Sequence, residues 1–526
     1  MSDGRFSNMP LILPASFAAA AVIAILLHLL AIPNVEPREP PLVKPRIPLI
    51  GHIIGLIRYQ AEYHMMLRRR TQKPIATLPM LNGKMYAIWD PTLVAAGLRS
   101  KHLSTTPQII SITKPLARIT DHTDAVLKGA DGEKLVQDVL ACMPPAFVGE
   151  SLKRMNGVAL SHLEGYFNGL ANGGEETVPS VWMWIRQLMA EPTGKAVFGN
   201  WNPFVKEPGF NQAIWDLEHD LLKLTTGVLP SVIAPAGHRA RALIARVLTE
   251  YYSGKNDQDP SASVFVGARA TALRNRNISD EDIGKIEMMV PFAALTNTVP
   301  SLFWLFSFIV SRPDLMLQLR DEVERGIVKR EGDEVTVTAS TSAIEERCPL
   351  LWACYRETLR TTVHQVSSRV AMQDVTLNDA EGRQYLLKKD AVVQMSIGSL
   401  NELEEYWGPN PADFEPTRFL DFANRSKAAE GRGSPKAMRA AFIPFGGGLH
   451  LCPGRMFAAA EMMAFTSTML LGYDVEPLDG KKWNLPPFGP RSLIDAVAKP
   501  ANNGEGFGIR IRRRQGWENV RWKYAL

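Results

Sequence analysis

Cysteine is scarce in this sequence of 526 residues, which contains only Cys142, Cys348, Cys354 and Cys452. Their spacings fit neither a disulfide framework nor a pair of C-x-x-C zinc knuckles. So few cysteines in so long a chain suit a reducing compartment. We expect the first three to be small buried hydrophobic residues, whereas Cys452 stands in an unusual setting.

An excess of charge of one sign and a dinucleotide-binding motif are also missing. The formal net charge is +5, and the basic run "RIRRR" (510–514) is typical of a solvated strand face. We therefore expect no nucleic acid partner. No G-x-G-x-x-G sequence lies between a strand and a helix, so the chain itself is expected to bind neither flavin nor nicotinamide. We find no internal repeat.

One long apolar run stands near the N-terminus, at residues 13–32. About 20 such residues span a bilayer, whereas the apolar core of a cleaved signal peptide, the alternative, has roughly 7–15. A proline-rich stretch follows, with Arg38, Lys44 and Arg46, which places the body in the cytosol by the positive-inside rule. The predicted division is an anchor at 1–34, a proline-rich hinge at 35–55 and one catalytic body at 56–526.

The remaining sequence shows mainly helical periodicity. Helices are expected at 149–172, 181–198, 210–227, 237–253, 279–310, 313–329, 342–362 and 453–471, and strands at 75–81, 85–90, 391–397 and 507–514. Ser279 and Asp282 form a capping-box-like start, and Pro313 stands in a first helical turn. The apolar stretch 288–310 carries three polar residues at its centre, so we expect a buried core helix. The predicted fold is mainly α with small β-sheets.

The stretch "AFIPFGGGLHLCPGRMFA" (441–458) places Cys452 at the start of a helix. Helix N-termini favour the thiolate, and the preceding glycines are expected to let the backbone fold tightly and direct N–H groups at the sulfur. Gly454 leaves room for a flat group. A single thiolate cannot complete a zinc site, which needs four ligands, but it can be the axial ligand of a haem.

The spacing of Phe445, Gly448, Cys452 and Gly454 matches the F-x-x-G-x-x-x-C-x-G motif, and the chain resembles the cytochromes P-450. "AALTNTVPSLFW" (293–304) and "ETLRTTVHQVSSR" (357–369) resemble the branch of the sterol 7α- and 12α-hydroxylases and prostacyclin synthase, and its fungal biosynthetic relatives. The resemblance implies the cytochrome P-450 fold with an N-terminal transmembrane helix and haem b with Cys452 as its iron ligand. Phe445 would pack over the sulfur and the haem face.

Several other residues gain a role from this resemblance. Glu357, Arg360 and Arg418 would form a buried network of ion pairs beneath the haem, which we call the lock because it would hold the core together. Arg369 and His450 would bind haem propionates, although His450 is also compatible with an ordinary loop residue. The family's Trp-x-x-x-Arg is absent, and "GEKLVQDVL" (132–140) stands in its place, so a third propionate partner stays open.

The chain departs from the family pattern at the positions that deliver protons to oxygen, where most members carry an acid followed by a threonine. Alignment of "AALTNT" places Ala293 and Ala294 at the small positions, Thr296 at the acid and Asn297 at the threonine. We take Asn297, Thr298 and Thr296 as candidate catalytic residues, since a proton relay needs polar groups within hydrogen-bond reach. The alternative is that Asn297 and Thr298 only satisfy backbone hydrogen-bonding groups of a helix that is kinked near Pro300.

The expected function is a monooxygenase in the endoplasmic reticulum membrane, with its catalytic domain in the cytosol. It would oxidise a lipophilic, terpenoid- or steroid-like substrate with electrons from NADPH-cytochrome P-450 reductase. Two alternatives remain: a reductase-independent haem-thiolate isomerase or dehydratase of the prostacyclin synthase type, and a non-catalytic haem-binding membrane protein. The sequence does not identify the substrate.

Overall fold

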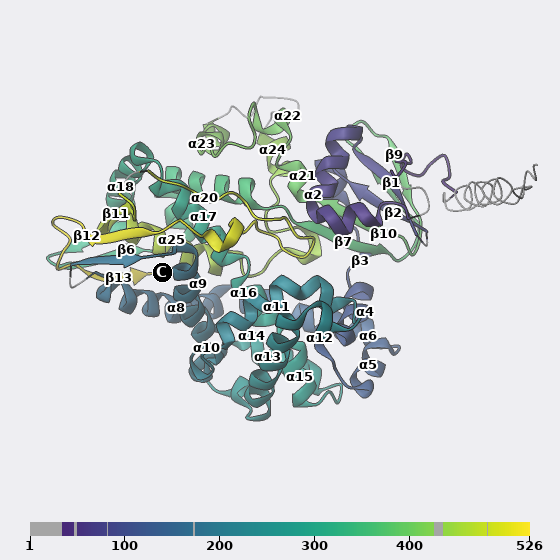
Figure 1. Ribbon diagram of the computed structural model, residues 1–526, viewed down its shortest axis with the longest axis horizontal. Helices are drawn as coiled ribbons and strands as arrows, with labels where there is room; N and C mark the ends of the chain where they lie inside the picture. The colour runs from purple at the N-terminus through teal and green to yellow at the C-terminus, as the bar shows by residue number, and fades with distance from the viewer. Residues whose placement is uncertain (1–33, 47–49, 82, 172–173, 425–434, 481) are drawn as a thin grey trace, which may run out of the picture.

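The computed structural model describes residues 34–46, 50–81, 83–171, 174–424, 435–480 and 482–526. The predicted anchor lies outside these residues except for Asn34. Within them the chain is mainly helical with small sheets, as the periodicity predicts (Figure 1). Part of the proline-rich segment runs beside the first strand, where the Val43 N–H donates to the Thr77 carbonyl at 2.9 Å.

The strands form a five-stranded sheet in the order β1-β2-β10-β7-β3 and three smaller sheets. The five-stranded sheet contains β1 (Ile75–Met80), β2 (Gly83–Ile88), β3 (Leu103–Ser104), β7 (Val366–Ala371) and β10 (Val392–Ser396). The others contain β4 (Glu175–Val178), β5 (Val328–Glu331), β6 (Glu334–Thr338), β8 (Val375–Asn378), β9 (Gln384–Leu387), β11 (Tyr473–Pro477), β12 (Ile509–Arg513) and β13 (Arg521–Ala525).

Most helices of the first half build the lower lobe in Figure 1 and one side of the core, whereas the first of them lies beside the five-stranded sheet. They are α2 (Ile53–Thr71), α3 (Pro91–Arg99), α4 (Thr106–Ala117), α5 (Asp121–Lys128), α6 (Gly132–Ala141), α7 (Met143–Ala146), α8 (Gly149–Gly169), α9 (Val181–Phe198), α10 (Pro203–Lys206), α11 (Phe210–Thr225), α12 (Pro230–Ile233), α13 (Pro235–Ser253) and α14 (Val264–Arg274).

The helices of the second half include the central ones that carry the site. They are α15 (Asp280–Ile286), α16 (Met289–Leu295), α17 (Thr298–Val310), α18 (Pro313–Ile327), α19 (Thr341–Arg347), α20 (Pro349–Thr362), α21 (Ile397–Leu400), α22 (Glu404–Trp407), α23 (Thr417–Asn424), α24 (Pro435–Ala441) and α25 (Arg455–Gly472). A short 3₁₀ turn, Gly448–His450, precedes α25. The predicted start signals are confirmed, because Ser279 caps α15 and Pro313 opens α18.

The segment predicted as one helix at 279–310 is instead three helices with breaks at 287–288 and 296–297. Proline has no N–H to donate to the carbonyl four residues earlier. Pro291 therefore leaves the carbonyl of Glu287 without its helical partner, and Pro300 does the same to Thr296. The two breaks fall at these residues, so the prolines explain them.

Proline also divides the predicted helix 342–362. Cys348 lies between α19 and α20 with φ −127° and ψ 61°, because a residue that precedes proline avoids the helical region. The carboxylate of Glu322 accepts the N–H groups of Leu350 and Leu351 at 2.8 and 2.9 Å, which satisfies the first turn of α20. A single helix over 342–362 was therefore the wrong prediction.

The apolar centre of the molecule is α17, in which every residue is buried. Asp280–Val310 is long and apolar enough to cross a membrane, but 83% of its apolar window is buried inside the protein. This confirms that 288–310 belongs to the buried core, although it forms α16 and α17 and not one helix. Helix α17 packs against α9, α20 and α25, and so places residues 293–301 at the centre of the fold.

Candidate active site

The loop before α25 holds Cys452 by backbone contacts. The Cys452 N–H donates to the Phe445 carbonyl at 3.0 Å, which closes the loop. Gly446 and Gly448 have φ of +69° and +62°, a region that favours glycine. A Cβ at Gly448 would overlap the carbonyl oxygen of Leu98 in α3, so this glycine allows the loop to pack on a helix.

The environment of the Cys452 thiol differs from the prediction in one respect. The N–H groups that hydrogen-bond to the sulfur belong to Gly454 and Arg455, which follow the cysteine, and not to the glycines before it. Burial raises the pKa of the Cys452 thiol, and these N–H groups and the Arg455 guanidinium lower it in part. A bound metal cation would complete the ionisation, because a coordinating thiol is deprotonated.

Cys452 opens onto a cavity of about 610 Å³ in the centre of the fold. Its lining is mainly apolar, with side chains from α4, α6, α14, α16, α17, α20 and α25. Phe445, His450 and Gly454 also line it, whereas Gly448 does not. A mainly apolar cavity with few polar groups is the usual form of a site for a lipophilic ligand.

Two basic side chains, Arg369 and His450, lie close together, and His450 lines this cavity. Arg369, on β7, is 5% exposed and has no acidic partner among the described residues. Burial lowers the pKa of its guanidinium to about 10. Burial and the charge of Arg369 also lower the pKa of His450. Such a pair without an anion is typical of a binding site for an acidic group.

The helix break at 296–297 presents polar groups to the cavity. Asn297 and Thr298 line it together with Ala293, Ala294 and Ser301, and the Ser301 hydroxyl donates to the Asn297 carbonyl at 2.8 Å. Thr296 is not part of the lining. It is buried, and its hydroxyl donates to the Phe292 carbonyl at 3.0 Å. The structure therefore brings two of the three candidate catalytic side chains to the cavity.

The predicted lock of Glu357, Arg360 and Arg418 is present. Arg360 donates from Nε and Nη2 to the two carboxylate oxygens of Glu357, both at 2.7 Å, and both side chains are fully buried. The Nε of Arg418 lies 3.4 Å from Glu357 Oε1. The Glu415 N–H donates to the same oxygen at 2.9 Å. This network ties α20 to the chain that leads into α23.

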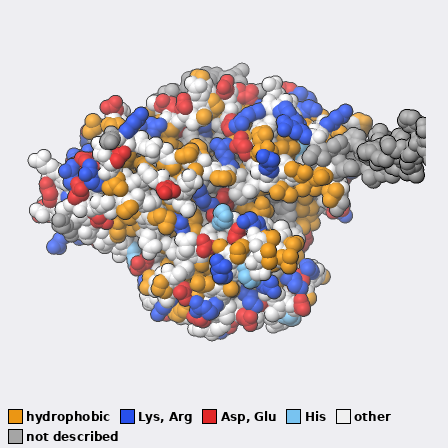
Figure 2. Space-filling model, viewed as in Figure 1, with side chains coloured by type: hydrophobic (Ala, Val, Ile, Leu, Met, Phe, Trp, Pro, Cys, Tyr) orange, Lys and Arg blue, Asp and Glu red, His pale blue; other side chains and the backbone are white. Residues whose placement is uncertain are grey.

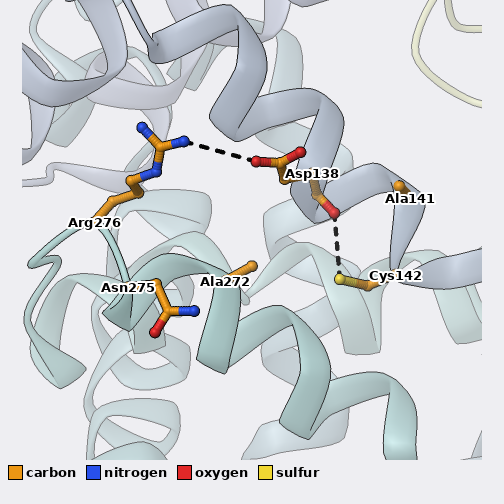
Figure 3. A pocket seen from close by; sticks show the side chains of 6 residues that line it. All are labelled: Asp138, Ala141, Cys142, Ala272, Asn275 and Arg276. Carbon is orange, nitrogen blue, oxygen red and sulfur yellow. Dashed lines mark hydrogen bonds and ion pairs between the residues drawn. The ribbon is translucent and has the colours of Figure 1, made fainter.

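A second cavity, of about 460 Å³, lies at the surface between α6 and α14. Figure 3 shows Asp138 between the Arg276 guanidinium, 3.8 Å away, and Cys142, whose thiol donates to the Asp138 carbonyl at 3.2 Å. Burial raises the pKa of the Cys142 thiol. The main polar groups of this hollow are thus engaged with one another, and the central cavity is the better candidate for the active site.

The chain is similar to known proteins along most of its length. The cytochrome P450 family model matches residues 209–501. A cytochrome P450 monooxygenase from Gibberella zeae is 34% identical over 496 residues, which cover 94% of this chain and 92% of that protein. The chain belongs to the cytochrome P450 family. A second fungal relative, cytochrome P450 monooxygenase nodJ from Hypoxylon pulicicidum, is 27% identical over 93% of each chain.

A mammalian relative confirms the predicted resemblance to the sterol hydroxylase branch. The 7-alpha-hydroxycholest-4-en-3-one 12-alpha-hydroxylase of Oryctolagus cuniculus is 26% identical over 287 residues, which cover 54% of this chain and 56% of that protein. The chain is therefore a P450 monooxygenase, and this family binds haem through a cysteine thiolate.

The residues of this P450 fit a haem. The cavity offers the Cys452 thiol in a mainly apolar lining, and nearby Arg369 supplies a buried cation that has no acidic partner in the part of the chain that the structure describes. Helix α6, at which the sequence leaves a third propionate partner open, lines the cavity with Leu135, Val136, Val139 and Leu140. Lys134 of the same helix pairs with Asp138 at the surface.

Sequence reasoning missed Arg455 and Tyr355. Arg455 lines the cavity and donates to the Cys452 carbonyl at 2.9 Å, and it was readable as the residue after the C-x-G motif. Tyr355, on α20, is buried at the cavity near Cys452, and burial with the charge of Cys452 raises the pKa of its hydroxyl. No local pattern marks Tyr355, because only the packing of α20 brings it to the cysteine.

Proposed function

We propose that this chain is a membrane-anchored monooxygenase that oxidises a lipophilic, terpenoid- or steroid-like molecule with electrons from NADPH-cytochrome P450 reductase. The observation that carries the proposal is the mainly apolar cavity of about 610 Å³ that opens onto Cys452. Names of relatives add support, since one acts on a steroid ketone and two are fungal monooxygenases.

Each site residue has a defined part in this proposal. Cys452 would hold the haem iron, and Arg369 and His450 would bind the propionates. The haem supplies activation of molecular oxygen, with the thiolate as its electron-rich ligand. Asn297, Thr298 and ordered water would hold and move the protons that this chemistry consumes. Ala293 and Ala294 leave space beside them because their side chains are small.

A spectral screen tests the proposed substrate class. Terpenoids and steroids are added to the purified holoenzyme, and displacement of water from the iron is followed as a shift of the haem absorption band. We expect saturable shifts with bulky lipophilic compounds and none with small polar ones. Compounds that shift the band are then incubated with NADPH and reductase. An absence of shifts across both lipophilic classes would contradict the proposal.

Replacement of Asn297 tests its proposed part in proton delivery to oxygen. We expect Asn297→Ala to slow turnover by about tenfold or more, because proton delivery loses an organising group. Hydrogen peroxide released per NADPH consumed should rise, with haem content unchanged. Thr296→Val is the matched variant and should keep the wild-type coupling, because Thr296 is not part of the cavity lining and its hydroxyl donates to the Phe292 carbonyl. Unchanged coupling in Asn297→Ala would remove Asn297 from the relay.

A second membrane contact is proposed at α12 and the residues before it. Val228, Leu229 and Val232 are exposed by 59%, 66% and 70%. Figure 2 shows hydrophobic side chains gathered on this side of the molecule, over the regions of α2 and α12 in Figure 1. An exposed apolar patch of this kind is suited to the interfacial layer of a bilayer.

Deletion of residues 1–34 tests the membrane contact. We expect the truncated chain to leave membranes only in part, as measured by fractionation at low salt. Adding Leu229→Asp and Val232→Asp should complete the release, because charge in the interface is costly. Leu317→Asp, on the surface of α18, is the matched control and should change nothing. Full solubility of the simple truncation would contradict the second contact.

A further inference from the structure

Three polar side chains that line the central cavity away from Cys452 already have partners. The Thr113 hydroxyl donates to the Ile109 carbonyl at 2.7 Å, and that of Ser301 to the Asn297 carbonyl. Arg269 forms two hydrogen bonds of 2.8 Å with Glu287. Gln365 differs from these residues. Its Oε1 is buried without a partner, and neither polar atom of its amide has a hydrogen-bond partner among the described residues.

The backbone around Gln365 is firmly held. Gln365 lies in the extended segment between α20 and β7, where the His364 N–H donates to the Ala496 carbonyl at 2.9 Å. The Gln365 carbonyl accepts the Ile397 N–H at 2.9 Å. Side chains alternate in extended backbone. Val363 and Gln365 accordingly line the cavity, whereas His364 is buried outside its lining.

A buried amide oxygen without a partner, such as Gln365 Oε1, is costly, and native proteins rarely keep one without a purpose. We infer that Gln365 is the polar anchor of the substrate, which is a lipophilic molecule carrying an alcohol group away from the carbon that is oxidised. The amide offers both a donor and an acceptor, so an alcohol satisfies it in either orientation. This inference rests on the proposed function, because it places the substrate in the same cavity.

Azoles test the anchor without knowledge of the substrate. The probes are 1-alkylimidazoles and 1-(ω-hydroxyalkyl)imidazoles of matched chain length, from four to ten carbons, which bind the haem iron of the holoenzyme through the ring nitrogen. Dissociation constants come from the shift of the haem band. We expect the hydroxyl to improve affinity by roughly fivefold to tenfold at one or two chain lengths, the effect of a single hydrogen bond.

Variants distinguish a specific hydrogen bond to Gln365 from an effect of the general polarity of the cavity. In Gln365→Leu the ratio of affinities between hydroxyalkyl and alkyl probes should fall to one or below at every length. Ser301→Ala is the matched control and should keep the wild-type ratio, since its hydroxyl is bonded to the backbone. A wild-type ratio near one at all lengths, or the same ratio in Gln365→Leu, would overturn the inference. Azole binding in either case would leave the proposed haem site intact.

Discussion

Cys452→Ser is expected to abolish the long-wavelength absorption band that the reduced, carbon monoxide-bound form of a thiolate-ligated haem shows. Serine keeps the size of the side chain and the loop contacts, including the bond from residue 452 to the Phe445 carbonyl. It removes the soft thiolate that makes the band. Protein yield and membrane fractionation should stay as in the wild type.

The other cysteines provide the controls for this experiment. Cys348 and Cys354 are fully buried, and burial raises the pKa of the Cys348 thiol to about 12 and that of Cys354 further. Neither lines the central cavity. Cys354→Ser should therefore keep the band. A full band in Cys452→Ser would remove Cys452 as the ligand and would require each remaining cysteine to be tested.

Glu357→Ala is expected to yield little holoprotein. The carboxylate faces Arg360 and Arg418 in a buried site, and its loss leaves their charge uncompensated. Removal of one partner from a buried ion pair costs about 3–5 kcal/mol, which is a large part of the stability of a domain. Haem content per protein and the midpoint of thermal unfolding measure the effect.

A surface ion pair is the matched control for Glu357. Glu345 pairs with Arg356 at 2.5 Å on the exposed side of the same region. Glu345→Ala should change the free energy of unfolding by less than about 1 kcal/mol, because solvent screens such pairs. Comparable losses of haem and of stability in both variants would contradict the account of the lock.

The long helices and the main strands could be predicted from the sequence because their hydrophobic period is local. Thus α9 lies at 181–198 as predicted, and β10 falls within 391–397. The breaks in the central helix were missed, although Pro291 and Pro300 mark them four residues downstream. The short helices α3 to α7 lack a sustained period, and tertiary contacts decide where they form.

The residues of the candidate site also divide into those that a local sequence motif predicts and those whose importance depends on the fold. Cys452 and its loop form one contiguous motif, and Glu357 with Arg360 forms another, so both were readable from the sequence. Gln365 was not, because its significance lies in the absence of a partner inside the folded cavity. Thr296 was included by alignment alone, and its position outside the cavity lining depends on the turn that Pro300 imposes.

Incorporation of labelled oxygen tests the central claim most directly. A compound that shifts the haem band is incubated with holoenzyme, NADPH, reductase and ¹⁸O₂, and the product is analysed by mass spectrometry. The account predicts a product that forms only with reductant and carries one labelled atom. A product that forms equally well without reductant, or that carries no label, would contradict a monooxygenase and indicate an isomerase.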